Sequence, residues 1–120
     1  MVRVLEYERW HGREPKDMNE VAPNHPGYDV ESKDGRSGEV RYIEVKSLRE
    51  AWNRRGVCMS LRQFEKGNEE QDNFWLYVVE KAETDEARVT PIQNPVGLVS
   101  EFYYDDSWRQ LADDESSEVG

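Results

Sequence analysis

The sequence predicts an α/β fold in which helices flank a mixed central sheet, and three observations lead to this prediction. Residues 27–30 and 42–46 alternate β-branched or aromatic residues with polar ones, which is typical of half-buried strands. Residues 74–81 form a near-continuous apolar run, which suits a strand in the middle of a sheet. Residues 2–11 and 60–68 carry helical spacing or capping signals, so the predicted order is helix, three strands, helix, strand.

The first predicted helix covers residues 2–11, where apolar residues recur at three- and four-residue spacing, and Gly12 ends it. It begins almost at the first residue of the chain, which leads us to expect a domain cut from a longer polypeptide. Residues 15–26 contain three prolines and little periodicity, so they predict a loop.

The next predicted element is an antiparallel hairpin. Residues 33–38 contain two glycines flanked by small polar or charged residues, which is typical of a turn. In the resulting register, the numbers of two facing residues sum to about 73. The predicted neighbours are Val30 with Ile43, Tyr28 with Val45, and Asp29 with Glu44.

Three more elements follow the hairpin. Residues 54–60 predict a third strand. Ser60 and Gln63 have capping-box spacing, which predicts that a short helix begins there. Residues 88–93 predict a last strand, placed at an edge because Pro91 cannot donate to a ladder.

Asp29, Glu44 and Lys46 share one face of the predicted hairpin, and the apolar residues share the other. Two carboxylates about 5 Å apart repel each other unless a cation lies between them. A divalent cation such as Mg²⁺ or Mn²⁺ would explain the pair, since hard cations select carboxylate oxygens. The alternative is a solvent-exposed face on which Lys46 neutralises one of the acids.

The same residues carry a resemblance to known proteins. An aspartate at the end of one strand, followed by Glu-x-Lys on the next, resembles the PD-(D/E)xK nuclease superfamily, although Tyr28 stands where the superfamily name has proline. A longer set of blocks between residues 2 and 98 is similar to the family of unknown function named after the C-terminal domain of the plant protein NO VEIN. The blocks are residues 12–15, 27–30, 41–46, 74–79 and 92–95.

The resemblance implies a restriction-endonuclease-like fold with an αβββαβ core, commonly appended to helicase or ATPase regions. It also implies two further metal ligands. Glu8 occupies the position of a first-helix glutamate that helps hold metal in PD-(D/E)xK enzymes, and the backbone carbonyl of Val45 would supply another oxygen. An ordinary exposed helix glutamate is the alternative for Glu8.

The chain's 120 residues make one domain, which we place at residues 1–98, followed by an acidic tail at residues 99–120 that is partly helical or disordered. A net charge of −10 is opposite in sign to that of proteins that hold nucleic acid unaided. A single cysteine leaves no internal disulfide, and no apolar stretch reaches membrane-spanning length. We therefore expect a soluble, cytoplasmic protein.

The charge is unevenly distributed along the chain. Residues 46–66 hold six basic residues and two acids, whereas residues 101–118 hold seven acids and one arginine. The basic segment predicts a nucleic-acid interface, and its tryptophan could stack on a base or sugar. An ordinary solvated surface is the alternative. The candidate interface residues are Arg49, Trp52, Arg54, Arg55 and Arg62.

The first functional hypothesis is metal-assisted hydrolysis of phosphodiester bonds in DNA, or alternatively RNA. Asp29 and Glu44 would hold one or two Mg²⁺ or Mn²⁺ ions, with Val45 and Glu8 completing the ligand set. Lys46 would position the attacking water or stabilise charge on the phosphoryl oxygens. A helicase or ATPase would be the partner, in the same polypeptide or a separate one.

Two other hypotheses remain open. One is a non-catalytic domain of the same fold that binds nucleic acid or protein. The other is a small acidic interaction protein that docks on a partner through Tyr103, Tyr104 and Trp108.

Overall fold

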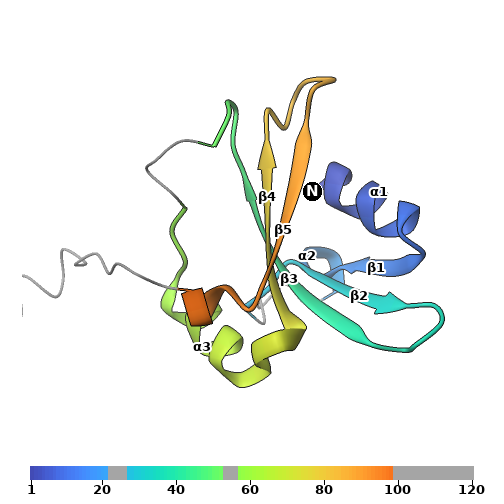
Figure 1. Ribbon diagram of the computed structural model, residues 1–120, viewed down its shortest axis with the longest axis vertical. Coiled ribbons are helices and arrows are strands. Elements are labelled where there is room, and N and C mark those ends of the chain that lie inside the picture. The colour runs from blue at the N-terminus through green and yellow to red at the C-terminus, as the bar shows by residue number, and fades with distance from the viewer. Residues whose placement is uncertain (22–26, 53–56, 99–120) are drawn as a thin grey trace, which may run out of the picture.

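The structure, a computed structural model, describes residues 1–21, 27–52 and 57–98 (Figure 1). The candidate interface residues Arg54 and Arg55 and the whole acidic tail lie outside the described residues. The elements are α1 Val2–Trp10, β1 Arg13–Asp17, α2 Met18–Val21, β2 Val30–Asp34, β3 Val40–Ser47, α3 Leu61–Glu70, the 3₁₀ turn η1 Gln71–Asn73, β4 Phe74–Glu80, β5 Arg88–Gln93 and the 3₁₀ turn η2 Pro95–Leu98.

The five strands form one mixed sheet in the order β1-β2-β3-β4-β5. The strands β1, β2 and β3 run antiparallel to one another, and β5 runs antiparallel to β4. The strands β3 and β4 are parallel and are connected through α3. The predicted fold class is therefore confirmed: helices flank a mixed sheet. The predicted order holds only in part, because the first of the three strands before α3 is β1, which precedes the hairpin and was not predicted, and α2 lies between β1 and β2.

The sheet has two covered faces (Figure 1). On the α1 face, Val4 packs against a buried cluster that includes Ile43 and Tyr77. On the opposite face, which we call the α3 face, Phe74 packs with Met18 of α2. Side chains alternate along a strand, so neighbouring residues of β3 and β4 take part in different cores.

Several predicted elements are confirmed closely. In the hairpin Val30 pairs with Ile43, and the turn lies between Asp34 and Val40. The helix α3 begins after Ser60 with the predicted capping box and continues to Glu70. The strand β5 has the predicted bounds and lies at the edge of the sheet.

Three predicted segments differ from the structure. The strand predicted at residues 27–30 shares only Val30 with β2, because the regular ladder begins there and runs to Asp34. Residues 15–21 do not form a loop, because β1 pairs with β2 along its whole length and α2 follows directly. Residues 57–60 form no strand, although their apolar content predicted one, and Cys58 is exposed. The charged, proline-containing β1 forms an edge strand because it pairs with β2, whereas residues 57–60 pair with no strand among the described residues.

The described residues include no helix that is long and apolar enough to cross a membrane.

Candidate active site

Asp29 is held in place just before β2 by main-chain and side-chain contacts. Its N–H donates to the carbonyl of Ile43 at 2.8 Å, and its carbonyl accepts from Met18 N at 2.9 Å. Its carboxylate Oδ2 accepts the N–H of Val45 at 2.8 Å. The regular ladder between β2 and β3 ends at Val30, so Asp29 does not form a regular strand pair with Glu44. The Asp29 side chain accepts the Val45 N–H in place of a main-chain carbonyl.

The segment before Asp29 depends on Gly27. Its φ of +92° is a conformation that favours glycine, and a Cβ there would lie 3.1 Å from the carbonyl oxygen of Arg62 in α3. This close approach carries Tyr28 to the α3 face, where its ring lies 5.0 Å from that of Tyr42. The prediction that Tyr28 lies beside Val45 is therefore wrong, because the strand alternation stops where the ladder stops.

Glu44 is a buried acid on the α3 face, with 3 % of its surface exposed. It lies beside the buried Leu76 of β4, and its Oε2 atom has no hydrogen-bond partner among the described residues. Burial and, after it, the nearby Asp29 carboxylate raise the pKa of Glu44 from 4.5 to about 8, and Lys46 opposes the rise. Glu44 is therefore largely protonated at neutral pH when no cation is bound.

Lys46 joins this acidic pair to α3. Its Nζ lies 3.6 Å from Glu44 Oε1 and donates to Gln63 Oε1 at 3.2 Å. The same Gln63 oxygen accepts the N–H of Ser60 at 2.8 Å, and the Ser60 hydroxyl accepts the N–H of Gln63 at 3.2 Å. The capping box at the start of α3 thus also orients the lysine.

The sequence pattern predicted Gln63 as a capping residue, and the structure also places it in contact with Lys46. The spacing of Ser60 and Gln63 predicted a capping box, and that role accounts for both residues along the chain. The contact with Lys46 spans 17 residues, and no local pattern indicates it.

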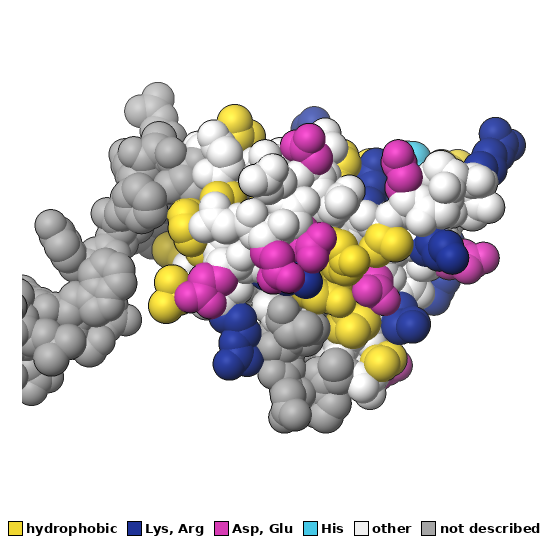
Figure 2. All heavy atoms as spheres, turned by 90° about the horizontal axis from the view of Figure 1, so that it is seen from below, with side chains coloured by type: hydrophobic (Ala, Val, Ile, Leu, Met, Phe, Trp, Pro, Cys, Tyr) yellow, Lys and Arg dark blue, Asp and Glu magenta, His cyan; other side chains and the backbone are white. Residues whose placement is uncertain are grey.

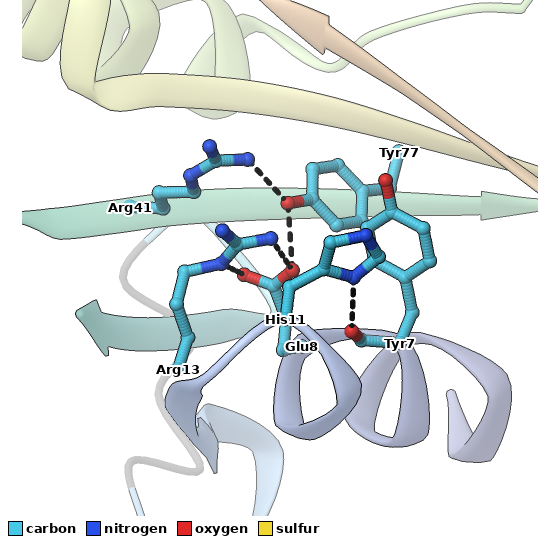
Figure 3. A network of polar contacts seen from close by, with 6 residues as sticks. All are labelled: Tyr7, Glu8, His11, Arg13, Arg41 and Tyr77. Carbon is cyan, nitrogen blue, oxygen red and sulfur yellow. Dashed lines mark hydrogen bonds and ion pairs between the residues drawn. The ribbon is translucent and has the colours of Figure 1, made fainter. Parts of the chain in front are cut away.

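Glu8 does not join the group. It lies on the α1 face, fully buried, and Figure 3 shows its carboxylate between Arg13 and Tyr77. Oε1 accepts from Arg13 Nε at 2.7 Å, and Oε2 accepts from Arg13 Nη2 at 2.7 Å and from the Tyr77 hydroxyl at 2.9 Å. In β4 the neighbouring Leu76 pairs with Glu44, so Tyr77 and Glu44 point to opposite faces of the sheet. The expectation that Glu8 completes the metal shell is therefore corrected: the sheet separates it from Asp29 and Glu44, and its oxygens already have partners.

The donor set on the α3 face fits a divalent cation. The described residues contain no group of three or more His, Cys, Asp or Glu side chains placed to hold a metal ion. Mg²⁺, however, is usually bound through one or two carboxylates, with waters and substrate phosphate completing an octahedron. The buried Glu44 Oε2, which no described residue hydrogen-bonds, lies next to the Asp29 carboxylate and matches that kind of site.

The predicted nucleic-acid interface is only partly described. Arg49 and Arg62 are exposed, and Arg62 lies in the first turn of α3, close to Gly27. Trp52 is half-buried, and its backbone N–H donates to Glu80 Oε1 at 2.6 Å. Lys66 lies over the rings of Tyr28 and Tyr42 and pairs with Glu70, so its charge is partly balanced within the domain.

Figure 2 views the molecule from the lower end of Figure 1 and shows basic and acidic side chains interspersed. This face carries no continuous basic surface among the described residues. A polyanion that met this face alone would be weakly attracted.

Comparison with known proteins gives one match. No curated protein and no solved structure matches the chain. Residues 2–92 match the family described as Protein NO VEIN, C-terminal. This match covers α1 to β5 and includes Asp29, Glu44, Lys46 and Gln63. The chain belongs to the Protein NO VEIN, C-terminal family.

Proposed function

We propose that this chain is a PD-(D/E)xK nuclease-like module that hydrolyses phosphodiester bonds of DNA, with RNA as the alternative substrate. One observation carries the proposal. Glu44 is buried with an oxygen that lacks a partner in the part of the chain that the structure describes, and it lies beside Asp29 and 3.6 Å from the Lys46 ammonium. Burying a carboxylate in this way is costly for folding and is typical of a functional site.

Each residue of the site has a distinct task in this mechanism. Asp29 and Glu44 would hold Mg²⁺ or Mn²⁺, with the Val45 carbonyl as a further oxygen ligand. The bound ion would polarise the phosphate and lower the pKa of a water molecule. Lys46, oriented by Gln63, would stabilise the charge that develops on the phosphoryl oxygens.

A partner that holds the nucleic acid is part of the proposal. The net charge of −10 and the interspersed charges in Figure 2 oppose unaided binding of a polyanion. A helicase or ATPase region, in the same polypeptide or a separate one, would supply the nucleic acid to the α3 face.

The same surface charge supports a second candidate function, a non-catalytic domain that binds nucleic acid or protein. In that case Glu44 stays protonated and holds no metal. Metal binding separates the two functions, because the catalytic function requires it.

Titration calorimetry of the intact chain with MnCl₂ at pH 8 tests the proposal. We expect saturable binding that disappears in Asp29→Asn and in Glu44→Gln. Glu14→Gln is the matched control, because Glu14 is an exposed acid on β1. Absence of Mn²⁺ binding in the unaltered chain would favour the non-catalytic function.

Cleavage of labelled DNA in the presence of Mn²⁺ and the partner then tests the role of Lys46. We expect Lys46→Met to retain Mn²⁺ affinity and to lose cleavage. Cleavage at an unchanged rate in Lys46→Met would contradict the mechanism.

A further inference from the structure

A polar pocket of about 420 Å³ lies on the α1 face, at the end of the sheet where β3 and β4 begin. Its walls include Arg13 of β1, Arg41 of β3 and Trp75 of β4. The sheet separates these residues from Glu44, whose side chain lies on the α3 face. The pocket is thus distinct from the candidate active site.

The two arginines of the pocket are anchored by the buried network in Figure 3. The Glu8 carboxylate accepts hydrogen bonds from Nε and Nη2 of Arg13, and Nη1 of Arg13 has no hydrogen bond to the described residues. Arg41 donates Nη1 to the Tyr77 hydroxyl at 2.8 Å, and its Cζ lies 3.8 Å from the centre of the Trp75 ring. The Nε and Nη2 groups of Arg41 have no hydrogen bond to the described residues. Both guanidinium groups are therefore held in position while N–H donors remain available.

The network also carries an excess positive charge. The carboxylate of Glu8 balances Arg13, with which it forms an ion pair at 2.7 Å. Arg41 has no carboxylate within 4.0 Å among the described residues. Tyr77 cannot balance it, because burial and the charge of Glu8 raise the pKa of that phenol and keep it neutral. A half-buried guanidinium without a counter-ion favours an anion beside it.

We propose that this pocket binds a small molecule through a single carboxylate or phosphate group, which Arg13 and Arg41 hold together. The volume suits a small metabolite, and Trp75 offers a flat apolar wall for the rest of the molecule. Three acids also line the pocket and outnumber its two arginines, although none forms an ion pair with either arginine within 4.0 Å among the described residues. These acids are Asp34, Glu39 and Asp72. The pocket therefore selects a single anionic group that contacts both guanidinium groups directly, and it repels a polyanion such as a nucleic-acid backbone.

Nuclear magnetic resonance of the ¹⁵N-labelled chain tests this assignment, with sodium phosphate and sodium acetate as separate probes at constant ionic strength. We expect saturable shifts of the Trp75 indole N–H and the Arg41 Nε–H signals with at least one probe. The probe that binds more tightly identifies phosphate or carboxylate as the preferred group.

Arg41→Gln should weaken that binding about tenfold or more, because charge-assisted hydrogen bonds are lost. Arg41→Lys keeps the charge but loses the planar donors, so it should give an intermediate loss and also serves if Arg41→Gln folds poorly. The exposed Lys16→Gln removes one positive charge elsewhere on β1 and should leave the affinity unchanged.

Three results would overturn the assignment. The first is the absence of a saturable shift with either probe. The second is the same affinity in Arg41→Gln and in the unaltered chain. The third is a shift of these signals with duplex DNA but not with the small anions.

Discussion

The two faces of the sheet each bury a glutamate, and the two glutamates differ in their partners. Glu8 on the α1 face is fully buried and receives three hydrogen bonds from Arg13 and Tyr77. Glu44 on the α3 face is almost as buried, but its Oε2 has no partner among the described residues and its pKa is raised to about 8. A buried carboxylate whose two oxygens both have partners belongs to the scaffold, whereas one with an unsatisfied oxygen has capacity left for a ligand.

The first prediction concerns the paired glutamate and carries the largest expected effect. Glu8→Gln should lower the free energy of unfolding by about 3–5 kcal/mol, because it leaves the Arg13 charge buried without its counter-ion. Urea denaturation measures the loss. Glu14→Gln, at an exposed position, should change stability by less than about 0.5 kcal/mol. An equally small effect of Glu8→Gln would remove the distinction between the two faces.

The second prediction is that Glu44→Gln raises the free energy of unfolding, whereas Glu8→Gln lowers it. Because the folded protein holds a proton on Glu44 up to about pH 8, while the unfolded chain releases it near 4.5, stability falls as the pH rises between these values. Glu44→Gln should remove this fall and raise the free energy of unfolding at pH 8 by up to about 4 kcal/mol. Thermal unfolding from pH 4 to 9 measures both curves, and parallel curves would show that Glu44 does not titrate in this way.

The third prediction uses the metal to sharpen the same contrast. At pH 8 and 100 times its dissociation constant, Mn²⁺ should stabilise the chain by about 2.7 kcal/mol, because it binds the folded state. Asp29→Asn and Glu44→Gln should abolish this gain. Calorimetric unfolding with and without MnCl₂ measures it, with MnCl₂ replaced by NaCl at equal ionic strength as the control.

The fourth prediction separates the two roles of Gln63 and carries the smallest expected change in stability. Ser60→Ala and Gln63→Ala should each lower the free energy of unfolding by about 1 kcal/mol, because each breaks the capping box. Only Gln63→Ala should also slow cleavage with unchanged Mn²⁺ affinity, since it removes the contact to Lys46. Equal cleavage rates in the two variants would assign Gln63 to capping alone.

Two short segments show where sequence patterns mislead. β1 has a charged sequence with a proline, yet it forms a strand because β2 offers it a partner along its whole length. Residues 57–59 are apolar, yet they form no strand, and Met59 packs on the α3-face core instead. The apolar pattern of a segment indicates whether it is buried. Whether the segment forms a strand also depends on a neighbouring strand, which the local sequence does not reveal.

In the candidate site, too, local sequence predicted some features and missed those that depend on tertiary packing. Alternation along the hairpin was enough to predict that Asp29, Glu44 and Lys46 lie together, although Asp29 comes just before the regular ladder. The sequence did not predict that Glu8 lies on the other face of the sheet or that Gln63 contacts Lys46. Both features depend on how α1 and α3 dock on the sheet.

The sequence by itself determined the hairpin register, the start of α3 and the edge strand β5. These features follow from local chemistry: two-residue alternation, a serine three residues before a glutamine, and a proline without an N–H donor. The tertiary structure alone decided which buried glutamate has partners for both carboxylate oxygens among the described residues and which has a partner for only one. That difference arises because Arg13 and Tyr77 converge on Glu8, while the apolar Leu76 lies beside Glu44.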